Sequence, residues 1–149
     1  MTGGCACGAI RYTATTEPLA GVHCQCRACQ RSSGTGHTSN MLFHAVCFQL
    51  EGPLKLWPAR ADSGNIVERG FCTECGSPIL STSTGMPNLV FVRAASLDDP
   101  ERFTPTMIIH GASAPEWDAI DSALPHFCVD PDKAIARVAA EASPPSCAA

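Results

Sequence analysis

Seven of the ten cysteines in this chain lie in short groups whose spacing is typical of metal binding. Cys5 and Cys7 are separated by one residue, Cys72 and Cys75 by two, and a glycine directly follows each pair. Paired sulfurs at this spacing converge on one metal ion, and the glycine allows the positive φ that such a turn commonly needs. We therefore predict a closed, four-sulfur structural zinc site that ties the N-terminal strand to the middle of the chain. The alternative is that the first pair consists of ordinary small strand residues.

The third group of cysteines, Cys24, Cys26 and Cys29, has no fourth cysteine beside it. Zinc held by three protein thiolates keeps an open position, and open positions are typical of catalytic or ligand-exchanging sites. Such a zinc is more Lewis-acidic than one with four thiolates, and a soft outside thiolate suits its vacant position. We therefore predict a zinc site that accepts a small thiol. Two alternatives remain, namely a disulfide within the group, or closure by a distant residue such as His23, His110 or Cys128.

Several charged or titratable residues are candidates for handling a ligand at this open site. Arg27 and Arg31 flank the third group, and guanidinium groups bind carboxylates through paired hydrogen bonds. We predict these arginines as ligand contacts, against the alternative that they are solvated surface residues. His23 and His110 are the candidate general acids. A strand at this point would turn the His23 side chain away from that of Cys24.

The other cysteines and the large aromatic residues have simpler expected roles. Cys47 lies between Val46 and Phe48 and is predicted to be a buried small hydrophobe. Cys147 lies near the C-terminus and is predicted to be a free thiol. The aromatic residues predicted to form the core or the walls of a cavity are Tyr12, Trp57, Phe71, Phe91, Phe103 and Trp117.

The composition describes a globular protein of 149 residues, 45% hydrophobic and 16% charged, which is the size of one domain. No apolar run reaches the roughly 18 residues that span a bilayer, and the N-terminus lacks the pattern of a secretory signal. We therefore expect a cytoplasmic protein with no membrane partner, in which reduced thiols favour metal over disulfides. A net charge of −4 argues against a nucleic-acid partner, which usually needs a basic face.

Short segments rich in β-branched residues, separated by glycine, proline, serine or asparagine, indicate an all-β protein. The predicted strands are residues 9–13, 39–43, 48–51, 54–57, 66–71, 78–81, 89–92 and 106–110, with the last of these as the final strand. Twelve glycines and twelve prolines favour a turn-rich antiparallel architecture. Short helices are expected around residues 27–32 and 116–120. We predict one domain over residues 1–129 and a tail over residues 130–149, with a weak helix at 131–138 and a frayed end.

The cysteine groups and their neighbours resemble a known family. The matching segments are residues 3–12, 23–34 and 70–78, supported by residues 95–100 and 115–117. In this order they are similar to the glutathione-dependent formaldehyde-activating enzyme and centromere protein V family, over roughly residues 3–127. The resemblance is specific because all three cysteine groups fall in register with their neighbours.

The resemblance implies a β-tent fold of small antiparallel sheets with zinc knuckles and two zinc sites. It implies that the four paired cysteines hold a structural zinc and that Cys24, Cys26 and Cys29 hold the zinc of the active site. The family's namesake activity, classed as that of a carbon–sulfur lyase, joins glutathione and formaldehyde to S-hydroxymethylglutathione. The implied partners are therefore a small-molecule thiol, with glutathione as co-substrate, and an aldehyde. Gln25 departs from the family, because many relatives have histidine at this position.

Other functions stay open on the sequence alone. A different small thiol or aldehyde could react at the same zinc, because residues outside the cysteines decide the substrate. A non-catalytic zinc-binding module that contacts a protein partner is the alternative from another class, and it predicts a closed second site or a large exposed apolar patch. Association with chromatin or the cytoskeleton, suggested by the centromere branch, is expected to need a basic extension, whereas this chain has an acidic balance. The sequence leaves the oligomeric state undetermined.

Overall fold

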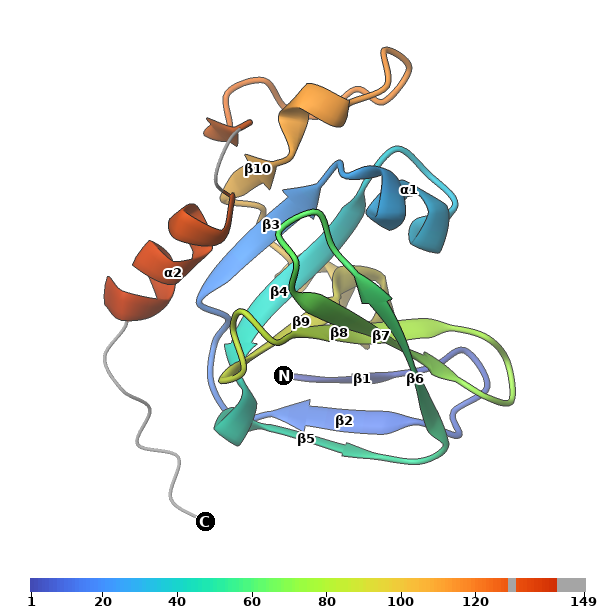
Figure 1. The fold of residues 1–149 in the computed structure, drawn as a ribbon. Helices are drawn as coiled ribbons and strands as arrows, with labels where there is room; N and C mark the ends of the chain where they lie inside the picture. Colours follow the sequence, from blue (N-terminus) through green and yellow to red (C-terminus); the bar gives the residue numbers. More distant parts are fainter. Residues whose placement is uncertain (129–130, 142–149) are drawn as a thin grey trace.

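The structure, a computed structural model, describes residues 1–128 and 131–141 (Figure 1). The predicted all-β class is confirmed, because the described residues form two sheets with only short helices between and after the strands. The smaller sheet has the order β1-β2-β5 and is antiparallel throughout. Its strands are β1 (Thr2–Gly4), β2 (Arg11–Ala14) and β5 (Phe48–Glu51).

The larger sheet has eight strands in the order β11-β10-β3-β4-β9-β8-β7-β6. In chain order they are β3 (Ala20–Cys24), β4 (Thr38–His44), β6 (Leu54–Arg60), β7 (Ile66–Cys72), β8 (Pro78–Ser83), β9 (Leu89–Arg93), β10 (Met107–Ile109) and β11 (His126–Phe127). The predicted antiparallel arrangement is wrong at one end, because β10 runs parallel to both β3 and β11. The expectation that residues 106–110 form the final strand is also wrong, since β11 follows them.

The central strands of the larger sheet are buried on both faces, as β4 illustrates. Successive residues of a strand point to opposite faces. Met41 and Phe43 therefore join the core between the two sheets, while Leu42 joins a second core on the other face. Cys24 belongs to this second core, which is completed by Ile135 of helix α2 (Pro131–Glu141). Figure 1 shows α2 lying beside β3, on the side away from the smaller sheet.

The helices agree in part with the sequence predictions. Helix α1 (Arg27–Ser33) confirms the expected helix after the third cysteine group, and α2 confirms the helix expected near residue 131. The helix expected around residues 116–120 is wrong, because this segment forms a turn in which the Asp118 amide donates to the carbonyl of Pro115 (3.0 Å). Four one-turn 3-10 helices complete the fold, η1 (Ala45–Cys47), η2 (Ala94–Ser96), η3 (Pro100–Arg102) and η4 (Gly111–Ser113).

The remaining expectations have mixed outcomes. Cys47 is buried as predicted, with 1% of its surface exposed, but it is disulfide-bonded and therefore not a reduced thiol. Cys147 lies outside the described residues.

Trp117 is 69% exposed, so the prediction that it forms part of the core or a cavity wall is wrong. Among the described residues no helix has the length and apolar character to cross a membrane. The domain boundary near residue 129 stays a prediction.

Candidate metal centres

The four-cysteine group (Cys5, Cys7, Cys72 and Cys75) is assembled from two turns. The first pair lies after β1, and the second begins at the last residue of β7. The four sulfurs lie within 4.8 Å of one another, with 3.4 Å between those of Cys5 and Cys7 and 3.9 Å between those of Cys7 and Cys72. Sulfurs bound to one tetrahedral zinc lie roughly 3.8 Å apart. All four are free thiols, so the group fits a closed metal site.

Backbone and side-chain hydrogen bonds fix these two turns. Gly8 (φ 79°) and Gly76 (φ 74°) adopt the positive φ expected from the sequence, and their amides donate to the carbonyls of Cys5 and Cys72. Ser77 joins the turns, since its Oγ accepts from the Ala6 amide (3.2 Å) and lies 3.2 Å from the Cys75 sulfur. Hydrogen bonds from the Ser77 side chain and backbone lower the pKa of Cys75 to about 6. This turn therefore favours the thiolate that a metal requires.

The three-cysteine group (Cys24, Cys26 and Cys29) lies where β3 passes into α1. Cys24 ends the strand, Cys26 caps the helix, and its sulfur accepts from the Cys29 amide (3.3 Å). The three sulfurs lie within 4.8 Å of one another, and no other His, Cys, Asp or Glu with a described side chain, in residues 1–128 and 133–141, joins them. All three are free thiols. For the described part of the chain, neither an internal disulfide nor closure by a distant residue is present.

The three-cysteine group stabilises negative charge on the sulfur of Cys29. Hydrogen bonds from the thiols of Cys24 and Cys26 lower the pKa of Cys29 to about 2, and the nearby guanidinium of Arg93 acts in the same direction. Arg93 is itself buried, with 6% of its surface exposed. One thiolate and two further sulfurs form a donor set that suits zinc, and the group leaves one side open for an outside ligand.

A cavity of about 410 Å³ opens beside the three-cysteine group, and we call it the cysteine cavity. All three cysteines line it, together with Arg69, Arg93 and His110. This volume lies within the range of small-molecule sites. His110 has a left-handed backbone (φ 57°), the single non-glycine case among the described residues. Such strain in a non-glycine residue is enriched at functional sites.

A second cavity of about 420 Å³ adjoins the first, and we call it the arginine cavity. Arg31, Arg69 and Arg93 line it, with Trp57 and Phe71 as aromatic walls. Arg31 therefore lies where a ligand could reach it. Arg27 lines neither cavity, and its guanidinium donates to Oε1 of Gln30. Arg69 and Arg93 could not be predicted as cavity residues from the sequence, because nothing in the local pattern of β7 or β9 marks them.

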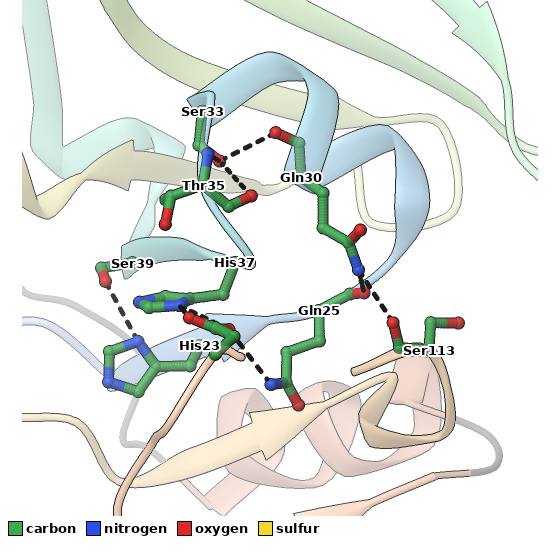
Figure 2. Close-up of polar contacts among 9 residues, drawn as sticks. His23, Gln25, Gln30, Ser33, Thr35, His37, Ser39 and Ser113 are labelled. Carbon is green, nitrogen blue, oxygen red and sulfur yellow. Dashed lines mark hydrogen bonds and ion pairs between the residues drawn. The ribbon is translucent and has the colours of Figure 1, made fainter. Parts of the chain in front are cut away.

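A polar network holds the segment that carries the three cysteines (Figure 2). The Gln30 amide donates to the carbonyls of Gln25 (2.7 Å) and Ser113 (2.8 Å), which holds the segment between the cysteines. The Gln25 side chain is 3% exposed and donates to Oδ2 of Asp118 (3.3 Å). The same carboxylate lies 2.9 Å from Nδ1 of His37. Gln25 is therefore a structural hydrogen-bonding residue in this network.

His23 belongs to this network and lines neither cavity. Its Nδ1 lies 3.0 Å from Oγ of Ser39, and its ring packs edge-on against those of His37 and Phe103. Burial lowers the pKa of His23 to about 4, and the neighbouring His37 acts in the same direction. Because the His23 ring is neutral and lies on the far face of β3, His23 is not placed to act at the cysteine cavity. His110 is the candidate histidine that lines this cavity.

These features define a class of small β proteins in which a closed and an open cysteine group could each hold a metal. The model of the family described as glutathione-dependent formaldehyde-activating enzyme matches residues 1–113, and the chain belongs to this family.

Two individual comparisons agree with this assignment. Over 145 residues the chain is 26% identical to a curated protein of Halomonas elongata, and 92% of each chain is covered. That protein carries the provisional name of a glutathione-dependent formaldehyde-activating enzyme. The crystal structure of a Rhodobacter sphaeroides protein superimposes with a TM-score of 0.53 at 19% identity, covering 66% of this chain and 88% of that one. The second similarity shows the fold alone.

Proposed function

We propose that the protein is a zinc-dependent enzyme of the carbon–sulfur lyase type that joins glutathione and formaldehyde to S-hydroxymethylglutathione. The observation that carries this proposal is the open three-cysteine group on a cavity of about 410 Å³. Membership of the family and the provisional name of the Halomonas elongata relative support it. A non-catalytic module with a closed second site is less well supported, because no described residue closes this group.

The two cysteine groups take different parts in the proposed enzyme. The four-cysteine group holds a structural zinc, and the three-cysteine group holds the zinc of the active site. When bound there, zinc supplies a coordination position for an outside thiol and favours its thiolate form. The walls of the cysteine cavity place this sulfur next to the aldehyde. Much of the rate gain then comes from proximity, because the uncatalysed addition already proceeds readily.

The chemical step needs one proton transfer. The sulfur electron pair forms the new C–S bond at the carbon of formaldehyde, the C=O π pair moves to oxygen, and this oxygen takes up a proton. The proton lost by the glutathione thiol balances the one gained by the product hydroxyl. His110 lines the cavity beside the cysteines and is the residue placed to deliver it.

The proposal is tested by exchange NMR with ¹³C-labelled formaldehyde and glutathione. We expect the zinc-loaded protein to raise the rate of exchange between free formaldehyde and its glutathione adduct well above the rate without protein. Protein stripped of zinc by a chelator is the control and should leave the uncatalysed rate unchanged. An exchange rate with zinc-loaded protein equal to the uncatalysed one would remove the assignment.

Replacing His110 with asparagine should lower the catalysed exchange rate by roughly a hundredfold, since a positioned acid contributes about this much or more. Asparagine tolerates the left-handed backbone of this position better than other side chains, so the fold and metal content should be retained. His126→Asn is the matched control, because His126 is exposed, lies on the neighbouring β11 and lines neither cavity. Equal rates for the two variants would show that His110 is not the acid.

A further inference from the structure

The arginine cavity is a direct continuation of the cysteine cavity. Four residues line both, namely Ala28, Ala59, Arg69 and Arg93. A ligand whose sulfur lies at the three-cysteine group can therefore extend past Arg93 into the arginine cavity. The combined volume exceeds what formaldehyde and a thiol group alone would need.

The charge of the arginine cavity differs in sign from that of the whole protein. The chain carries a net charge of −4, yet Arg31, Arg69 and Arg93 line this cavity and no described Asp or Glu does. None of the three arginines belongs to an ion pair among the described side chains of residues 1–128 and 133–141. A cluster of cations without acidic partners fits an anionic ligand, and guanidinium groups match a carboxylate best.

Arg93 is the arginine of this cluster whose guanidinium is held in place by hydrogen bonds. Its Nη1 donates to Oδ1 of Asn40 (2.7 Å) and its Nη2 approaches Oγ of Ser32 (3.4 Å). These neutral partners orient the guanidinium and add no carboxylate to the arginine cavity, while the sulfur of Cys29 faces the same guanidinium from the cysteine cavity. Arg69 and Arg31 reach the cavity from β7 and α1 and are less buried than Arg93. Trp57 and Phe71 supply the apolar walls against which the stem of an extended ligand can lie.

We propose that the arginine cavity binds a carboxylate-bearing end of the thiol ligand, with Arg31 and Arg69 as its contacts and Arg93 between that end and the sulfur. This inference rests on the proposed function and deepens it. It selects thiols that carry a carboxylate several bonds from the sulfur, as glutathione does, over neutral thiols of the same size. Arg31 and Arg69 are then the residues that determine substrate specificity.

The experiment compares glutathione with glutathione diethyl ester, which keeps the thiol and loses both carboxylates. Calorimetric titration of the zinc-loaded protein should give roughly tenfold tighter binding of glutathione than of the ester. Arg31→Gln and Arg69→Gln should each reduce this ratio at least about threefold while leaving the affinity for the ester unchanged. Lys55→Gln is the matched control, because Lys55 is an exposed cation of the nearby β6 that lines neither cavity.

Each outcome decides a different part of the proposal. Equal affinity of the unaltered protein for both ligands would overturn the carboxylate site while leaving the thiol enzyme intact. An unchanged ratio in Arg31→Gln and Arg69→Gln, or an equal fall in Lys55→Gln, would show that general electrostatic attraction accounts for the preference. Failure of both ligands to bind would overturn the proposed function and this inference together. Zinc content and circular dichroism confirm that each variant is folded.

Discussion

Replacing Cys75 with serine is expected to lower the midpoint of thermal unfolding of the zinc-loaded protein by about 10 °C or more. The side chain is exposed, and substitutions of exposed residues usually change stability little. Here the sulfur is one of four that converge within 4.8 Å, so its loss should weaken binding of the proposed structural zinc, which would join the turn after β1 to the end of β7. Differential scanning calorimetry at a fixed zinc concentration measures the effect.

The control for this variant is Cys128→Ser, which removes another exposed thiol outside both cysteine groups. We expect its unfolding midpoint to match that of the unaltered protein. After treatment with a strong chelator, the Cys75 variant and the unaltered protein should unfold at nearly the same temperature. A large difference that persists without zinc would mean that Cys75 stabilises the fold by packing and not through a metal.

Replacing Cys26 with serine is expected to abolish glutathione binding and catalysed exchange while the fold remains. Serine is a good helix N-cap, so its hydroxyl can accept from the Cys29 amide as the Cys26 sulfur does. The variant keeps the cap but lacks one of the three thiolates. We therefore expect it to lose about one zinc per chain and to show only the uncatalysed exchange rate.

Metal analysis and calorimetric titration with glutathione check this prediction. The unfolding midpoint should fall much less than in Cys75→Ser, because the three-cysteine group joins one strand to the adjacent helix, whereas the four-cysteine group joins distant parts of the chain. Retention of full glutathione affinity by Cys26→Ser would contradict the assignment of the open site to this group.

The cysteine groups could be predicted because their spacing is a local property of the sequence. The turn after β1, the turn after β7 and the start of α1 each place two sulfurs side by side through a few backbone angles. Gly8 and Gly76 marked two of these turns correctly. The one long-range prediction is that Cys5 and Cys7 share a site with Cys72 and Cys75. It follows from the four thiolates that a closed zinc site requires.

Features that depend on strand pairing could not be predicted in this way. Strand β3, which delivers Cys24, contains Gly21 and was not recognised, because tertiary packing decides its conformation. The parallel pairing of β10 depends on the path of the chain after residue 93, which has no local signal. Arg69 and Arg93 share a cavity because β7 and β9 are both neighbours of β8 in the larger sheet. No pattern within either strand indicates this meeting.

The separation of cysteines along the chain would set the order in which the two proposed zinc sites can form during synthesis. The three-cysteine group is complete within residues 24–29, so its members meet by closing a very short loop. The four-cysteine group needs Cys75, which leaves the ribosome much later, and it also needs strands that pair across long distances. We therefore expect the three-cysteine group to bind zinc while the chain is still being synthesised and is flexible. The four-cysteine group should bind its zinc last.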